Sequence, residues 1–321
     1  MVSFIVPCYN YAHFLGECVS SILSQTYPDF EVLIMDNNSP DNTPEVAASF
    51  GDERVIHVRN EQNIGVIANI NKGLALAKGE YVWLVNADDK LRNNRALEKY
   101  MGFLEKNPGV GFIVSPVIVL RDGKEDDGLL GFTDLGPTDK LMKAPEVGYK
   151  ALNGCPVCII AALIKKNYLL EIGGFRPELP INSDWYLLGA MGMAHDAGYV
   201  AEPMANFRIH GSNSSTSSAR DFHRDQNLAT IHLLRRRAED LGLWTLAWAC
   251  QAEIPKIFVR VGRQAYRNGN LDFARENFRL ALRSGAQSRR AYTGLLLVFM
   301  RKIKIFLQFP LRKTNSFLKT K

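Results

Sequence analysis

The 321 residues exceed what one hydrophobic core usually serves, so the length predicts two domains, or one domain with an appendage. The composition, 46% hydrophobic and 22% charged, is that of a folded globular protein and excludes a disordered chain. The net charge of +6 comes largely from the end of the chain, because residues 289–321 hold nine Lys or Arg and no Asp or Glu.

The cysteines and the N-terminus indicate the compartment. Five cysteines scattered over the chain do not make a disulfide framework, which favours a reducing compartment, the cytoplasm by default. The chain begins with an apolar, strand-like run at residues 2–6 instead of a signal peptide, and no uncharged run approaches the roughly 20 residues that span a bilayer. We therefore expect a cytoplasmic protein, whose basic tail can bring it to the inner face of a membrane.

Short apolar runs alternate with helical segments through the first third of the chain. The predicted strands are residues 2–6, 31–35, 54–58 and 80–85. The predicted helices are residues 14–25, 43–50, 66–78 and 95–106. This order is typical of βαβ units and predicts an α/β fold with a mostly parallel sheet flanked by helices, which binds ligands beyond the carboxyl ends of its strands.

The pattern is looser between residues 109 and 210. The predicted elements are strands at residues 109–114 and 116–120, an apolar block at 157–164, a helix at 184–193, and strands near Tyr199 and at 206–209. The polar, glycine-rich residues 121–140 predict a surface loop. These elements complete the α/β domain near residue 210.

Beyond that point the sequence predicts helices alone. The serine-rich residues 211–219 indicate a mobile loop. The predicted helices are residues 221–241, 244–268, 271–284 and 289–309. The spacing of a single tetratricopeptide-like hairpin is present at Gly262, Ala265, Tyr266, Ala274, Phe278 and Ala281. We therefore divide the chain into two halves of an α/β domain, residues 1–115 and 116–218, and a helical region, residues 219–321, with a basic amphipathic tail.

Polar residues follow the early strands. Residues 7–10 are PCYN, residues 36–39 are DNNS and residues 86–89 are NADD. None of these turns carries a glycine-rich phosphate-binding motif, so a nucleotide at this edge must be held by side chains and a metal. Asp88 and Asp89 offer hard oxygen ligands that suit Mn²⁺ or Mg²⁺ bridging a diphosphate, and the alternative is a turn or helix-capping role.

Three segments in order along the chain, residues 6–43, 63–73 and 79–89, resemble the family 2 inverting glycosyltransferases of GT-A fold. The resemblance covers roughly residues 1–210. It implies transfer of a sugar from a nucleoside diphosphate, UDP above all, to a hydroxyl of a glycan or lipid-linked acceptor, with inversion and a divalent metal. It further implies a donor-binding first half, an acceptor-binding second half, and a role in bacterial glycan or cell-envelope polysaccharide synthesis.

The resemblance assigns the donor site. Asp88 and Asp89 correspond to the metal-binding motif, and Asn86, which stands where the family often has another Asp, can bond a ribose. An aromatic wall with one acceptor suits a uracil or thymine ring. The residues implied for the nucleotide are Pro7 and Tyr9 as the wall, Asp36 as the acceptor of the base imide, and Asn63, Asn69 and Arg208 as further contacts. Ile70 occupies the place of a family arginine.

The resemblance also assigns the catalytic base. Asp184 follows a Gly-Gly-Phe motif, as the family base does, with Ser183 in place of a frequent Glu, and Glu178 is the second candidate. A helix-capping role is the alternative for Asp184. His210, two residues after Arg208, completes the metal shell or touches the diphosphate, unless it is a surface histidine.

Two other readings compete with this one. A sugar-phosphate nucleotidyltransferase needs a glycine-rich start with basic residues, which is absent. The second alternative is a catalytically degenerate sugar-nucleotide-binding or scaffold subunit. It is retained because Asn86, Ile70 and Ser183 depart from the family pattern.

Two further sequence features lie outside the donor and base motifs. Cys155 and Cys158 have no second ligand pair and are interpreted as packing residues at the acceptor side of the cleft. Residues 295–313 mix aromatic and aliphatic residues with cations, which is typical of attachment to an anionic membrane, with a buried terminal helix as the alternative. Nothing accompanies the basic tail that would indicate nucleic-acid binding.

Overall fold

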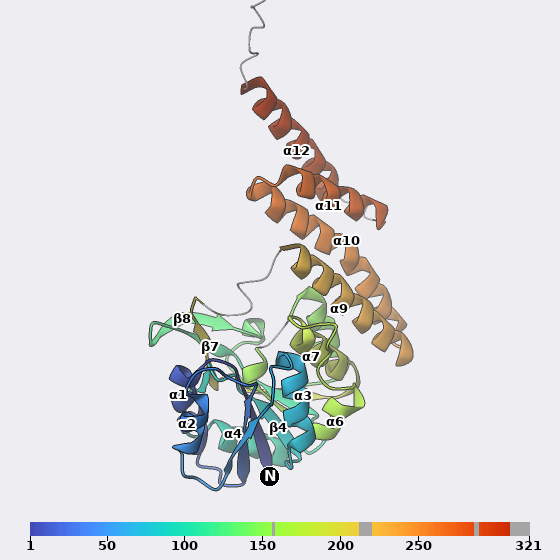
Figure 1. Ribbon diagram of the computed structural model, residues 1–321. Coiled ribbons are helices and arrows are strands. Elements are labelled where there is room, and N and C mark those ends of the chain that lie inside the picture. Colours follow the sequence, from blue (N-terminus) through green and yellow to red (C-terminus); the bar gives the residue numbers. More distant parts are fainter. Residues whose placement is uncertain (156–157, 212–219, 286–288, 309–321) are drawn as a thin grey trace, which may run out of the picture. The chain divides into compact units, whose positions relative to one another are not determined.

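The computed structural model describes residues 1–155, 158–211, 220–285 and 289–308, and the chain divides into two compact units, Met1–Gln251 and Ala252–Lys321 (Figure 1). The first unit contains both β-sheets and the helices around them. Residues 212–219, nearly all of the predicted mobile loop, lie outside the described residues.

The first third of the chain folds as the sequence predicts. Its strands are β1 (Val2–Cys8), β2 (Phe30–Asp36), β3 (Val55–Arg59), β4 (Tyr81–Leu84) and the short β5 (Lys90–Leu91). Its helices are α1 (Ala12–Leu23), α2 (Thr43–Ala48), α3 (Val66–Leu76) and α4 (Ala96–Lys106). The four predicted strands and the four predicted helices are confirmed, with ends that differ by a few residues.

These strands form the parallel part of an eight-stranded sheet with the order β3-β2-β1-β4-β10-β6-β11-β9. The neighbours β3, β2, β1 and β4 are parallel, as are β6 (Phe112–Val114) and β11 (Ala197–Tyr199). The antiparallel members are β10 (Ala162–Lys165), between β4 and β6, and the edge strand β9 (Lys140–Met142). The mostly parallel α/β sheet expected from the sequence is therefore confirmed.

Strand β1 is buried on both faces, and its alternating side chains face different helices. Phe4 belongs to the main core cluster together with Leu15 of α1 and Tyr100 of α4. Its neighbour Ile5 faces α3, where a Cβ added to Gly73 would lie only 2.8 Å from the Ile5 side chain. Glycine at that position lets α3 lie close to the sheet, and helices cover both of its faces (Figure 1).

A second, four-stranded sheet has the order β5-β12-β7-β8, in which β12 (Ala205–Ile209) and β7 (Val117–Arg121) run parallel. Its edge strand β8 (Lys124–Leu130) lies within the predicted loop at residues 121–140, so that prediction was wrong. Every residue of β8 is exposed, and the strand therefore lacks an apolar face that the sequence pattern could reveal. Antiparallel pairing with β7 through the Asp122-Gly123 turn, where φ is 48° and 76°, holds it in place.

The remaining elements of the first unit surround these sheets. They are η1 (Thr133–Leu135), α5 (Glu146–Lys150), η2 (Ala151–Asn153), η3 (Ile159–Ala161), α6 (Lys166–Glu171), α7 (Ser183–Ala194) and α9 (Arg220–Asp240). Helix α9 packs on α7, where a Cβ on Gly189 would lie 2.9 Å from Leu234. The boundary predicted between residues 218 and 219 thus falls inside the first unit, because α9 is part of it.

The C-terminal helices agree with the prediction. They are α9, α10 (Trp244–Arg267), α11 (Leu271–Arg283) and α12 (Arg289–Gln308). In the second unit Phe278 packs between Gly262 and Gly294, where added Cβ atoms would lie 2.9 Å and 2.4 Å from its ring. Among the described residues, no helix combines the length and the apolar character that crossing a membrane requires.

Candidate active site

A cavity of about 650 Å³ lies at the carboxyl ends of β1 and β4, where the sequence predicts the site. Seven of the predicted site residues line it, namely Pro7, Tyr9, Asn69, Asn86, Asp88, Asp89 and Asp184. Four do not line it, namely Asp36, Asn63, Arg208 and His210. The structure therefore brings the predicted base, Asp184, to the same hollow as the predicted metal ligands, although α7 and β4 lie about 100 residues apart along the chain.

Asp88 and Asp89 follow β4 but have different surroundings. The Asp88 carboxylate Oδ2 lies 3.0 Å from His210 Nε2. Asp89 is more deeply buried, and its two oxygens accept from the Arg208 backbone N–H at 2.8 Å and the Asn86 side-chain amide at 3.0 Å. Burial, followed by the charge of Asp88, raises the pKa of Asp89 well above its ordinary value. Asp88 therefore faces His210, whereas both oxygens of the Asp89 carboxylate are bonded within the protein.

Arg208 is held by this same corner instead of facing the cavity. Its Nε donates to the Asp88 backbone carbonyl at 2.7 Å, and its Nη2 bonds the Glu17 carboxylate at 2.5 Å. The guanidinium also lies 4.8 Å from the ring centre of Phe14. These contacts place Arg208 as a support for Asp88, whereas the sequence predicts a contact with the donor.

Asp184 lies in the first turn of α7. Its Oδ1 accepts from the Trp185 backbone N–H at 2.7 Å. Desolvation raises the pKa of Asp184 to about 6, although hydrogen bonds from the Trp185 backbone and the Cys155 thiol oppose the rise. A carboxylate with a pKa near 6 is ionised at neutral pH and still basic enough to take a proton, which suits a general base.

The loop before α7 connects Asp184 to the first half of the domain. Asn71 of α3 receives a hydrogen bond from the Phe175 N–H at 3.0 Å and donates to the Phe175 carbonyl at 2.8 Å. Gly174, at φ 69°, approaches Asn71 so closely that a Cβ there would lie 2.9 Å from the amide oxygen. The Ser183 hydroxyl accepts from the Arg176 N–H at 2.6 Å and joins the other end of this loop to α7. The Gly-Gly-Phe motif therefore connects α3 to the start of α7, where Asp184 lies.

A network of amides forms the wall at the end of β2. Asn60, buried, donates to the side-chain oxygens of Asn37 at 3.0 Å and Asn69 at 2.8 Å, and Lys72 donates to Asn60 at 2.7 Å. Asn63 accepts from Asn37 at 2.8 Å, outside the cavity. Because an ammonium only donates, Lys72 fixes the orientation of the Asn60 amide and through it those of its neighbours.

Asp36 is fully buried behind this wall. Its carboxylate accepts from the Ser39 backbone N–H at 2.8 Å and pairs with Arg59 at 3.2 Å and His57 at 3.4 Å. Asp36, which the sequence predicts to contact the nucleobase, is thus engaged within the protein. Asn37, next to it in the chain, lines the cavity instead.

Several lining residues were not predicted from the sequence. Tyr11 packs edge to face against the His210 ring at 5.5 Å. Ile181 and Phe207 line the wall near Asp184. Phe207 and Arg208 are neighbours on β12 and face opposite sides of the strand, so the prediction of Arg208 at the donor excluded Phe207.

The two cysteines that the sequence predicts to be packing residues differ in exposure, because Cys155 is exposed and Cys158 is half-buried. Cys155 and Cys158 both line the cavity. Burial, followed by the charges of Asp184 and Asp89, raises the pKa of the Cys158 thiol to about 12. The Cys158 thiol therefore stays protonated at neutral pH and is a weak nucleophile.

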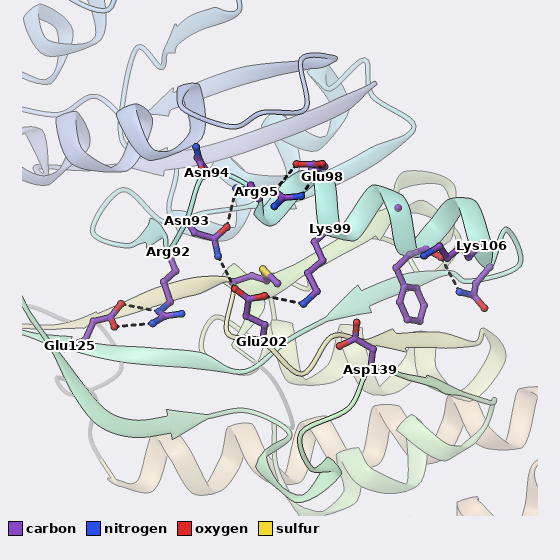
Figure 2. Close-up of a pocket in the computed structure, with 14 residues that line it drawn as sticks. Arg92, Asn93, Asn94, Arg95, Glu98, Lys99, Lys106, Glu125, Asp139 and Glu202 are labelled. Atoms are coloured by element: carbon purple, nitrogen blue, oxygen red, sulfur yellow. Dashed lines mark hydrogen bonds and ion pairs between the residues drawn. The ribbon is translucent and has the colours of Figure 1, made fainter.

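A larger cavity of about 920 Å³ lies elsewhere in the first unit, around the start of α4, and shares no lining residue with the first (Figure 2). Six of its charged side chains form three ion pairs. Arg92 bonds Glu125 at 3.0 Å, Arg95 bonds Glu98 at 3.1 Å and Lys99 bonds Glu202 at 2.9 Å. The chemistry of the smaller cavity therefore identifies it as the candidate site, despite its smaller volume.

Comparison with known proteins finds relatives of this chain. Residues 3–160 match the model of the family described as Glycosyl transferase family 2. Glycosyltransferase GlyG of Streptococcus pneumoniae serotype 4 is 37% identical over 112 residues, which are 34% of this chain and 37% of that protein. The first three curated relatives are matched over only 30% to 54% of their own length.

Two solved structures have a similar fold. Staphylococcus aureus TarS 1–349 in complex with UDP-GlcNAc has a TM-score of 0.65 at 15% identity, covering 96% of this chain and 91% of that one. The mannosyltransferase PcManGT of Pyrobaculum calidifontis, in complex with GDP-Man and Mn²⁺, has a TM-score of 0.54 at 18% identity, covering 95% and 86%. The GT-A fold expected from the sequence is thereby confirmed.

Proposed function

This chain belongs to glycosyltransferase family 2, and we propose that it transfers a sugar from a nucleoside diphosphate, UDP in the first place, to an acceptor hydroxyl with inversion. One observation carries the proposal. A single cavity is lined by Asp88 after β4, Asp184 at the start of α7, and the aromatic face of Tyr9. These are a metal ligand, a base and a surface for a nucleobase, which are the parts that such a transfer needs.

The nucleoside end of the donor would lie against Tyr9. Its side chain is 46% exposed and lines the cavity beside Pro7, so a base can stack on it. Asn37 and Asn69, whose amides are oriented through Asn60, face the same space. UDP is favoured because TarS, of similar fold, was solved with UDP-GlcNAc.

A divalent cation would neutralise the site. The described residues that line the cavity include Asp88, Asp89 and Asp184 and no Lys or Arg, so a diphosphate there would be repelled without a cation. No group of three or more His, Cys, Asp or Glu in the described chain could hold a metal. We propose that Asp88 and His210 hold Mn²⁺ or Mg²⁺ together with donor oxygens and water, and that Asp89 acts by anchoring the turn. Such a cation, when bound, stabilises the charge of the departing diphosphate.

The base would be Asp184. As the acceptor oxygen forms its bond to the anomeric carbon, the bond from that carbon to the diphosphate breaks and its electron pair leaves with the diphosphate. The acceptor proton passes to the Asp184 carboxylate, whose pKa near 6 leaves it ionised at neutral pH. One displacement of this kind inverts the anomeric configuration.

The acceptor would approach from the second half of the domain. Ile181, Phe207 and Leu130 of the β7–β8 hairpin form an apolar wall of the cavity there. We propose a glycan or lipid-linked acceptor in bacterial cell-envelope polysaccharide synthesis, with the protein in the cytoplasm at the inner face of the membrane. Residues 1–115 would bind the donor and residues 116–218 the acceptor.

The test is donor turnover by the purified chain. A panel of nucleoside diphosphate sugars is incubated with Mn²⁺, and the released nucleoside diphosphate is measured for wild type and for Asp184→Asn. The proposal predicts a preferred donor, turnover that stops with EDTA, and loss of transfer in the variant. Binding of a donor without any turnover would instead identify a degenerate sugar-nucleotide-binding subunit.

A further inference from the structure

Helix α12 of the second unit has two apolar stripes, and the chain covers one of them. The covered stripe includes Ala291 and Val298, both buried, and Gly294, on which a Cβ would lie 2.4 Å from the Phe278 ring. Val298 and Phe278 belong to the core cluster of this unit. This stripe explains how α12 is fixed to α11.

The second stripe is exposed. Its members are Tyr292 at 62%, Leu296 at 57%, Phe299 at 62%, Met300 at 57% and Ile303 at 42% exposed. They occur at offsets of 4, 7, 8 and 11 from the first residue, which is the spacing of one face of a helix. At about 1.5 Å per residue the stripe runs for about 17 Å. A helix that is apolar on both sides and covered on one indicates a further apolar partner.

The charges around this stripe are of one sign. Arg289 and Arg290 precede it, Lys304 follows Ile303, and all three cations are exposed. From Arg289 to the end of the chain there is no Asp or Glu to balance them. An apolar stripe with cations at both ends complements a surface that offers acyl chains and negative headgroups together.

The same charges disfavour a second copy as the occupant. Two α12 helices packed stripe to stripe would bring cations against cations, with no acidic side chain on either helix to pair with them. An anionic lipid surface supplies the missing negative charge.

We propose that the stripe defined by Tyr292, Leu296, Phe299, Met300 and Ile303, hereafter the α12 stripe, is a docking surface for an anionic lipid bilayer. The helix would lie in the plane of the interface, with the stripe among the outer acyl segments and the exposed cations on its side of the helix, Arg289 and Lys304, at the headgroups. This would retain the protein where a lipid-linked acceptor is found. The inference deepens the proposed membrane location, yet it needs no assumption about sugar transfer.

The experiment measures binding of the full chain to vesicles. Vesicles of phosphatidylcholine alone are compared with vesicles that contain about one third phosphatidylglycerol, at low and at high salt. We expect binding to the anionic vesicles alone, weakened by salt. The stripe variant Leu296→Gln/Phe299→Gln/Met300→Gln/Ile303→Gln should bind at least about a hundredfold more weakly, because four exposed apolar side chains are lost.

Charge is tested by a matched pair of variants. Arg289→Gln/Lys304→Gln should weaken binding by about tenfold or more, at roughly fivefold per cation. Arg279→Gln/Arg283→Gln removes the same charge from exposed positions of α11 and should change binding by less than about threefold. Equal losses in the two charge variants would overturn the proposal, because binding would then follow net charge alone.

Two further outcomes would also overturn it. One is equal vesicle binding by wild type and the stripe variant, provided that circular dichroism shows both folded. The other is a dimer of the wild type, without vesicles, that the stripe variant converts to monomer, because the stripe would then be a protein interface. Donor turnover is measured on the same samples without vesicles, so failure of membrane binding and failure of the proposed transferase function are separate results.

Discussion

Two cavities among the described residues of the first unit differ in volume and in chemistry, and the larger one has the less suitable chemistry for a ligand. The larger, about 920 Å³, is surrounded by cations and carboxylates that form ion pairs with each other, such as Arg92 with Glu125 and Lys99 with Glu202 (Figure 2). The smaller, about 650 Å³, gathers three aspartates and the exposed ring of Tyr9. Surface ion pairs that satisfy one another leave little for a ligand, whereas converging carboxylates call for a cation or a proton. Side-chain chemistry, more than volume, therefore identifies the smaller cavity as the candidate site.

Removal of the proposed metal ligand should give the largest difference in activity between variants of the two cavities. Asp88→Ala should lower kcat/KM for transfer by about a thousandfold or more, because the charge of the leaving diphosphate would lose its counterion. The matched control, Glu202→Ala in the larger cavity, should leave kcat/KM within about threefold of wild type. Near-normal turnover of Asp88→Ala in EDTA would remove the metal from the mechanism.

Asp184→Asn should have the next largest effect, a loss of about 10²- to 10⁴-fold in kcat with donor affinity retained. The pH profile of the wild type sharpens this prediction. Because the pKa of Asp184 is about 6, kcat/KM should fall about tenfold for each pH unit below 6 and level off above it. Asn cannot accept the proton, so the residual rate of the variant should lack this step. An unchanged rate, or the same step in the variant, would assign the base role to another group.

Tyr9→Ala should raise the KM for the donor by about tenfold with little change in kcat, because loss of a stacking face weakens ground state and transition state alike. Tyr9→Phe is the matched control and should keep the wild-type KM, since it retains the ring. An equal rise of KM in both variants would assign the contact to the Tyr9 hydroxyl. An unchanged KM in both variants would show that the nucleobase does not bind against Tyr9.

The ionised carboxylate of Asp184 should also destabilise the fold. Its pKa rises from 3.8 to about 6 on folding, so the folded state holds its proton more tightly and stability falls as pH rises between those values. The full cost at pH 7 is at most about 3 kcal/mol, less for partial solvent access. Asp184→Asn should therefore melt a few degrees above wild type at pH 7.5, with the difference vanishing near pH 4. A variant that melts below wild type at pH 7.5 would contradict the burial cost.

The smallest effect is expected in the larger cavity. Arg92→Gln/Glu125→Gln removes one exposed ion pair from its lining and should change kcat, KM and melting temperature little. The corresponding changes in activation, binding and unfolding free energy should each be less than about 1 kcal/mol. A loss of transfer comparable to that of Asp184→Asn would show that this cavity takes part in the reaction.

The sequence predicted the elements of residues 1–115 better than those of residues 116–218, for physical reasons. Buried parallel strands such as β1 and β4 are continuous apolar runs that end in polar turns, so both their position and their edge can be read. Strand β8 is exposed throughout and is held by pairing with β7, and the Asp122-Gly123 turn was its one local signal. Periodicity cannot reveal a strand whose stability comes from its neighbour.

Side-chain positions were predictable where the backbone decides them and otherwise not. Asp88 and Asp184 line one cavity because a strand end and a helix start bring them there. Arg208 and Asp36 were expected at the donor, yet both are engaged within the protein, Arg208 with Glu17 and Asp36 with Arg59. Those ion pairs join residues that lie far apart along the chain, so no local pattern announces them.

The most direct test is a crystal structure of the chain with UDP and Mn²⁺, with the manganese located by its anomalous scattering. The account predicts a peak within bonding distance of Asp88 and His210, with the uracil ring on Tyr9 and the diphosphate toward Asp184. A nucleotide bound in the cavity of Arg92 and Glu202, or manganese without contact to Asp88, would contradict it.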